Sequence, residues 1–221
     1  MILSTRLKNL DAIGKTYFLN TLLKETNFHM QTKITRLIYC HMEDTVADLK
    51  SYFEMDDSLD ARFFKKVPQD LLSLVLPGST CIVFDDMLPA FMGDKSLIDL
   101  LFRLSSIYVR HRKLYIFFCS QSSDILKKSH KLNLSISQSS HYILFRTLSE
   151  SKTLKRFFSN FSLNLKHDLA EIFENYIMTK QFGYLVLSVG PQCPRNSAYS
   201  NILLSEPGFM LSFDKSDDEE D

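Results

Sequence analysis

The sequence Thr-Cys-Ile-Val-Phe-Asp-Asp at residues 80–86 is an apolar run that ends abruptly in two carboxylates. Its apolar and β-branched residues predict a buried β-strand. Two adjacent carboxylates cannot be buried at low cost, because each charge would lose its hydration. We therefore expect Asp85 and Asp86 to lie where this strand ends, at a place where a cation or water meets them.

A second motif lies upstream of this strand. Gly14-Lys15-Thr16 precedes an apolar run with helical spacing at residues 17–23. Backbone N–H groups at such a helix start bind phosphate together with a lysine, and the following hydroxyl binds Mg²⁺. The order of the two motifs is that of Walker A and Walker B in P-loop nucleoside triphosphatases. The sequence therefore predicts ATP and Mg²⁺ as ligands.

The rest of the chain alternates between strand-like and helix-like segments. Strands are predicted at residues 34–40, 80–86, 113–119, 141–146 and 183–189. Helices are predicted at residues 17–23, 45–53, 96–109, 150–160 and 165–180, with one or two short helices within 60–76. This alternation favours an α/β fold of the RecA/ASCE-like P-loop type, with a mainly parallel β-sheet and helices on both faces.

Parallel sheets bind ligands at the carboxyl ends of their strands. The predicted ends carry Lys15-Thr16, Asp85-Asp86 and Ser120-Gln121. Each pair has a simpler interpretation, namely a surface charge at a helix end, a solvated turn and a helix cap. Because all three would lie on one edge of the sheet, we favour a nucleotide site.

Length and composition predict one domain, over residues 1–208, followed by an acidic, disordered tail at 209–221. Residues 214–221 contain six acids and one base, so the rest of the chain carries a formal charge of +5. No run of about 18 apolar residues and no signal-peptide pattern is present, which predicts an intracellular protein without a membrane span. The widely spaced Cys40, Cys81, Cys119 and Cys193 predict buried, reduced thiols.

Several blocks resemble a known family, the DNA-packaging ATPases of the FtsK/HerA superfamily found in polinton-like elements, adintoviruses and related large DNA viruses. The blocks at residues 14–19 and 82–87 resemble its phosphate loop and its Walker B motif. Residues 110–113 and 115–121 resemble its basic segment and its sensor strand. With the later strand-like blocks, the resemblance extends over most of residues 10–205.

The resemblance implies roles at the nucleotide. Gly14, Lys15 and Thr16 would bind the phosphates, with Lys15 on the β and γ phosphates and Thr16 on Mg²⁺. Asp85 would support the metal shell, and Asp86 would orient the attacking water. The implied activity is ATP hydrolysis.

The resemblance also implies groups that respond to the γ-phosphate. Gln121 would sense it, and Arg112 would reach the nucleotide of a neighbouring subunit, with Arg110 as the competing residue. The alternative for both arginines is a basic helix end that favours the helix dipole or contacts DNA phosphate. An arginine that acts between subunits implies a homo-oligomeric ring.

The function implied by the resemblance is an ATP-driven motor that translocates double-stranded DNA into a capsid, without reading its sequence. Capsid proteins would be partners, and the nucleus or a viral assembly site would be the location. Asn9 stands where the family has its first loop glycine, and Asp11 adds a negative charge near the phosphate position. These departures leave open a non-catalytic or decayed assembly protein with the ATPase fold.

Overall fold

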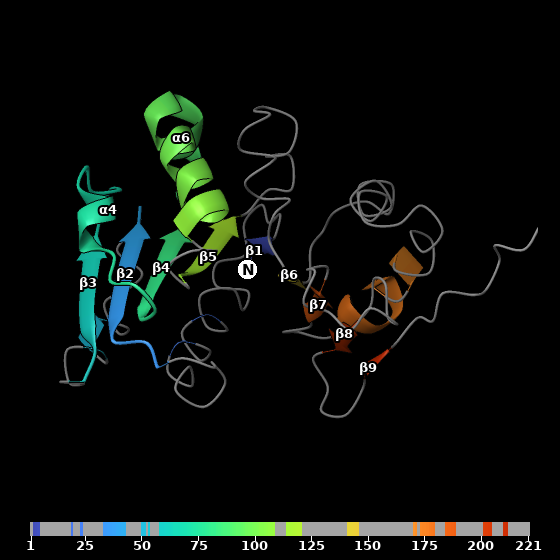
Figure 1. The fold of residues 1–221 in the computed structure, drawn as a ribbon. Coiled ribbons are helices and arrows are strands. Elements are labelled where there is room, and N and C mark those ends of the chain that lie inside the picture. The colour runs from blue at the N-terminus through green and yellow to red at the C-terminus, as the bar shows by residue number, and fades with distance from the viewer. Residues whose placement is uncertain are drawn as a thin grey trace, which may run out of the picture. The chain divides into compact units, whose positions relative to one another are not determined.

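A computed structural model describes residues 2–4, 19, 23, 33–42, 50–51, 53, 58–108, 114–120, 141–145, 170–171, 173–179, 184–188, 201–204 and 210–211. The chain divides into two compact units (Figure 1). The first unit contains Met1, Lys15–Ser120 and Asp124–Gln138. The second unit contains Ile2–Gly14, Gln121–Ser123 and Ser139–Asp221. The acidic pair lies in the first unit.

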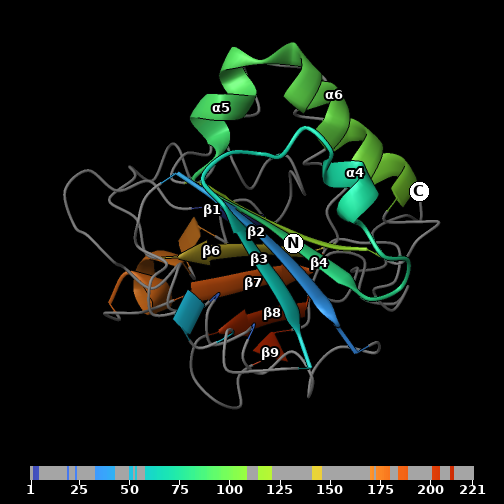
Figure 2. The ribbon, with the colours of Figure 1, turned by 90° about the vertical axis from the view of Figure 1, so that its left-hand side faces the viewer.

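The first unit contains a parallel sheet of four strands. In spatial order these are β3 (Asp60–Phe64), β2 (Arg36–His41), β4 (Thr80–Asp85) and β5 (Tyr115–Ser120). All three pairings between neighbours are parallel. Figure 2 shows β2, β3 and β4 running side by side, with α5 and α6 to one side of them. The strands predicted from the patterns at 34–40, 80–86 and 113–119 are confirmed, and this unit has an α/β architecture with a parallel sheet.

The core of this unit explains why the central strand β4 is an almost continuous apolar run. Every residue of β4 is buried, as expected for a central strand of a sheet covered on both faces. Helix α5 (Leu88–Gly93) places Phe91 on one face, edge-to-face against Phe84 with ring centroids 5.2 Å apart. The same ring lies 5.5 Å from Phe118 of β5. This aromatic cluster fixes α5, and with it the turn after β4, onto the sheet.

Helix α6 (Lys95–Arg103) follows α5 and begins at a side-chain cap. Asp94 accepts a hydrogen bond from the backbone N–H of Ser96 at 2.7 Å, which satisfies one donor of the first turn. The helix continues into a π-helical segment, Leu104–Tyr108. The helix predicted at 96–109 is therefore present, with its last turn wound more loosely than an α-helix.

The short helices predicted within 60–76 need correction. The segment begins with the strand β3, and only Leu71–Leu74 forms a helix, α4. Residues 60–64 alternate polar and apolar residues over only four positions, so their strand conformation also depends on tertiary pairing with β2. That pairing includes a stack of the Tyr39 and Phe63 rings, with centroids 5.6 Å apart and planes 28° apart.

An ion cluster lies at the amino ends of β2 and β3. Arg36 donates from Nε to Asp60 Oδ2 at 2.8 Å, and its Nη1 donates to the carbonyl oxygen of Leu74 at 2.8 Å. Arg62 donates from Nε to Asp60 Oδ1 at 3.0 Å. The hydrogen bond from Arg62, followed by the contacts with Arg36, lowers the pKa of Asp60 below its ordinary value.

The second unit has a different strand arrangement. Its strands are β1 (Ile2–Ser4), β6 (His141–Phe145), β7 (Tyr184–Ser188), β8 (Asn201–Leu204) and β9 (Met210–Leu211). Only the β1–β6 pair is parallel among these described strands, and the β6–β7, β7–β8 and β8–β9 pairs are antiparallel. The strands predicted at 141–146 and 183–189 are confirmed, whereas β8 and β9 were not predicted. Strand β9 falls within the range assigned to the tail.

The remaining predicted helices are described only in part. Residues 19, 23, 50, 51, 53, 170 and 171 are helical, and Phe173–Ile177 forms a π-helical turn. The helix predicted at 150–160 lies outside the described residues. Over the part of the chain that the structure describes, no helix combines the length and apolarity needed to cross a membrane.

Candidate functional site

The two carboxylates lie at the carboxyl end of β4, as the sequence predicts. Asp85 is the last residue of the strand and is 6% exposed. Asp86 follows it with a φ of 51°, in the left-handed region that aspartate tolerates better than most residues. Its backbone N–H donates to the carbonyl oxygen of Cys119 at 3.2 Å. The left-handed residue ends the strand, and Asp86 is partly exposed just beyond the buried Asp85.

The register of the sheet places one residue of each neighbouring strand directly beside Asp85. His41 of β2 and Cys119 of β5 are the partners of Asp85 on its two sides. Paired residues on parallel strands project to the same face of a sheet. His41 is 5% exposed and Cys119 is fully buried, so Asp85 lies in a closely packed row.

Tyr39 contacts Asp85 directly. Its Oη donates a hydrogen bond to Asp85 Oδ2 at 2.8 Å, across two neighbouring strands. The Tyr39 ring is fully buried, and the His41 ring packs against it edge-on with centroids 6.2 Å apart. Burial first, and then the negative charge of Asp85, raise the pKa of Tyr39 far above its ordinary value. The phenol is therefore protonated at every physiological pH and acts as a donor.

The acidic pair offers oxygen ligands of the kind that Mg²⁺ prefers. No group of three or more histidine, cysteine or acidic side chains that could hold a metal occurs among the described residues. Mg²⁺ in phosphoryl-transfer sites is bound by one or two carboxylates together with substrate phosphates, and it keeps several waters. Asp85 and Asp86 supply carboxylates of this kind, so the residues present suit a Mg²⁺–nucleotide complex better than a structural metal.

The other predicted site residues lie outside the described residues and remain predictions. These are Gly14, Lys15, Thr16, Arg110, Arg112 and Gln121. In the helix predicted after the phosphate loop, Leu19 and Leu23 are described and buried, one helical turn apart. Their burial agrees with an apolar helix face at this point.

Sequence reasoning identified the acidic pair but missed Tyr39 and His41. Both occur in the predicted strand region around residues 34–40, two positions apart, so strand alternation places them on one face. Two side chains that carry polar groups in an otherwise apolar strand could have indicated a functional site. The missing information was the register, because Tyr39 and Asp85 are 46 positions apart in the sequence.

Comparisons with known proteins support the fold. No family model matches this chain. No curated protein matches it significantly either. The cytoplasmic domain of the Thermomonospora curvata Type VII secretion ATPase EccC matches over 96% of this chain and 25% of its own length, with a TM-score of 0.56 and 10% identity.

A second solved structure also matches this chain. It is Thermomonospora curvata EccC (ATPases 2 and 3) in complex with a signal sequence peptide, matched over 66% of this chain and 30% of its own length, with a TM-score of 0.47 and 13% identity. The chain thus spans less than a third of the length of either EccC structure. At this level of identity, the match with the cytoplasmic domain establishes an α/β P-loop NTPase fold.

Proposed function

We propose that this chain hydrolyses ATP with Mg²⁺ at the carboxyl end of β4. The observation that carries the proposal is the position of Asp85 and Asp86, which end a fully buried central strand in a P-loop NTPase fold. Ligands of such sheets bind at this edge. The similarity to domains of a secretion ATPase supports the fold on which the proposal depends.

In this proposal the two carboxylates have separate tasks. Asp85 and Thr16 would hold Mg²⁺, which would supply positive charge to the phosphate oxygens. Asp86 is partly exposed and orients a water molecule toward the γ-phosphorus. The water oxygen forms a bond to phosphorus while the bond to the β-phosphate oxygen breaks, which yields ADP, inorganic phosphate and a proton. Lys15 would balance the phosphate charge.

We propose further that hydrolysis drives movement along double-stranded DNA by a ring of identical subunits, in genome packaging of a virus or virus-like element. The resemblance of the sequence blocks to packaging ATPases supports this part of the proposal. Arg112 or Arg110 would act on the neighbouring nucleotide, Gln121 would respond to the γ-phosphate, and the basic body of the chain would contact DNA phosphates.

The test is ATP turnover by the purified chain with Mg²⁺, with and without double-stranded DNA. Lys15→Ala and Asp86→Asn should abolish turnover, whereas Asp60→Asn removes an exposed acid far along the sheet and should not. DNA stimulation of the wild-type rate is expected for a motor. A folded wild-type chain that binds no Mg²⁺·ATP would overturn the proposal.

The same test distinguishes the second candidate, a non-catalytic assembly protein. Asn9 favours it, because a side chain at the position of a loop glycine hinders the approach of backbone to phosphate. Such a protein would form its assemblies equally well after Lys15→Ala or Asp86→Asn. Turnover that both substitutions abolish would exclude it.

A further inference from the structure

We infer that Tyr39 is a positioning residue for the proposed magnesium site, in which its hydroxyl fixes the orientation of the Asp85 carboxylate. The inference rests on the proposed function and assigns a role within the same site. It follows from the 2.8 Å hydrogen bond between Tyr39 Oη and Asp85 Oδ2, at the end of the central strand.

Both partners of this hydrogen bond are buried, which makes the bond stronger than a solvent-exposed one. Tyr39 is fully buried, and Asp85 is 6% exposed, so bulk water does not compete strongly for either group. A hydrogen bond to an ionised acceptor in such surroundings is stronger than one between neutral groups. The bond holds one oxygen of the carboxylate and so restricts rotation of the whole group.

The ring of Tyr39 is itself held in place. Phe63 stacks on it with centroids 5.6 Å apart, and His41 meets it at an interplanar angle of 60°. The two contacts come from β3 and from β2 itself. A ring fixed in this way gives its hydroxyl one position, and a metal site depends on such fixed partners behind its ligands.

The chemical role of Tyr39 is limited to donation. The tyrosine hydroxyl has one O–H group to donate, and Tyr39 directs it to Asp85 Oδ2. A neutral donor also leaves the negative charge of Asp85 in place, which a cation needs. Tyr39 therefore acts through Asp85 and does not replace it.

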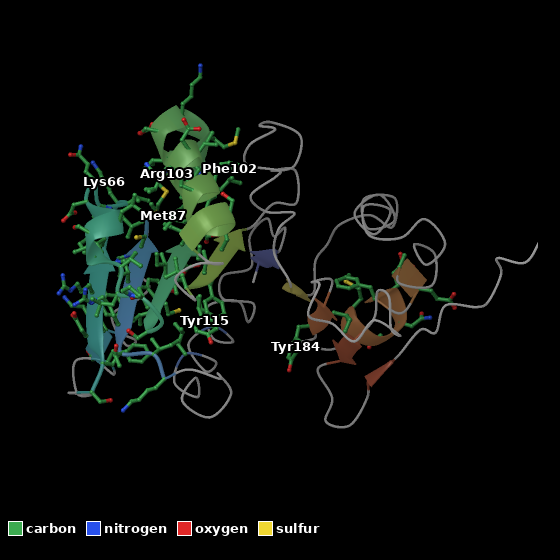
Figure 3. All side chains as sticks on the ribbon, in the orientation of Figure 1. Lys66, Met87, Phe102, Arg103, Tyr115 and Tyr184 are labelled. Atoms are coloured by element: carbon green, nitrogen blue, oxygen red, sulfur yellow. The ribbon has the colours of Figure 1, made fainter. Side chains whose placement is uncertain are left out.

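The experiment compares Tyr39→Phe with Tyr115→Phe in the full chain. Tyr39→Phe keeps the ring and removes the hydroxyl. Tyr115 lies at the amino end of β5, paired with Cys81, and Figure 3 shows it at the opposite end of the sheet from Met87, which follows the acidic pair. Tyr115→Phe therefore removes the same atom from a partly exposed tyrosine away from the site.

The first readout is binding of Mn²⁺ in the presence of ATP, measured by electron paramagnetic resonance, which does not require turnover. We expect Tyr39→Phe to weaken Mn²⁺ affinity about tenfold, the effect typical of a lost partner of a metal ligand. We expect Tyr115→Phe to leave it unchanged. The Mg²⁺ concentration for half-maximal ATP turnover should rise by about the same factor, and excess Mg²⁺ should restore the rate.

A double-mutant cycle tests whether Tyr39 acts through Asp85. Asp85→Asn should weaken Mn²⁺ binding, and adding Tyr39→Phe to it should cause little further loss. Losses that multiply would overturn the inference, as would wild-type Mn²⁺ affinity in Tyr39→Phe. A wild-type chain that binds no Mn²⁺ with ATP would overturn the proposed function, and the role of Tyr39 with it.

Discussion

A carboxylate of a neighbouring strand lies at each end of strand β2, and the two carboxylates differ in exposure and in hydrogen-bond partners. At the amino end, Arg36 and Arg62 surround Asp60, whose side chain is 40% exposed. Toward the carboxyl end, Tyr39 donates a neutral hydroxyl to Asp85, which is 6% exposed. One carboxylate is well exposed and pairs with two arginines, and the other is buried and accepts a hydrogen bond from a neutral hydroxyl.

This difference separates an exposed, ion-paired acid from the buried acid of the proposed site. An exposed ion pair adds little to stability, because water and salt screen both charges. A buried carboxylate costs more to desolvate, and such groups concentrate at sites that use their charge. The contrast predicts that substitutions near Asp85 affect function and those near Asp60 do not.

The largest effect is expected from the acidic pair. Asp86→Asn should lower ATP turnover by about a hundredfold or more, because an amide orients the attacking water less well than a carboxylate does. Steady-state phosphate release measures it. Asparagine also tolerates the left-handed backbone of residue 86, so the fold should persist. An equal loss of turnover in Asp60→Asn would show that the carboxylates at the two ends of β2 do not differ in function.

The next effect is on stability, at the Tyr39 hydrogen bond. Tyr39→Phe should lower the free energy of unfolding by about 2 kcal/mol, because a hydrogen bond to a buried charged group is lost. Urea unfolding followed by circular dichroism measures this change. Tyr115→Phe serves as the control and should change it by less than about 0.5 kcal/mol. Identical unfolding of Tyr39→Phe and wild type would show that the bond contributes nothing.

A smaller effect is expected at Asp60. Asp60→Asn should cost less than about 1 kcal/mol at neutral pH, since the carboxylate is well exposed. The pKa of Asp60 is lowered in the folded protein, so its contribution is present above its ordinary value of 3.8 and is lost as pH falls through the folded value. Urea titrations of both proteins should therefore converge in acid. A difference that grows toward low pH would contradict the ion pairing.

The smallest effect is expected on the reactivity of the cysteines between the two ends of β2, where the strand is buried. Burial raises the pKa of Cys40 to about 12, and it also raises the pKa of Cys81 in the neighbouring strand β4. Both thiols should therefore remain unmodified by iodoacetamide at about pH 8 and react only after denaturation. Peptide mass spectrometry resolves the two positions. Rapid labelling in the folded chain would show that the sheet opens.

The sequence predicted most of the first unit because its central strands are strongly apolar and turn residues mark where a strand begins. Pro77-Gly78 precedes β4, and Gly78 adopts a φ of 79° that favours glycine. The burial of Cys40, Cys81 and Cys119 was likewise predicted from their apolar surroundings and is confirmed. Residues 60–64 were misjudged as helical, because their polar and apolar residues alternate over only four positions, from Asp60 to Phe63.

The second unit was less predictable. Strands β6 and β7 have apolar patterns of their own, whereas β8 and β9 are short and take their conformation from antiparallel pairing. Short segments of this kind carry weak local preference, so their partners decide their structure. The parallel order that the sequence favoured describes the first unit well and the second only at β1 and β6.

The sequence by itself determined that residues 80–85 form a buried strand with two carboxylates at its end, because burial of apolar side chains is a local preference. Tertiary structure alone decided which groups face Asp85. The parallel register that sets His41 beside it, and brings the Tyr39 hydroxyl within 2.8 Å, joins segments 46 residues apart. Register follows from the packing of whole strands against one another, which no local pattern encodes.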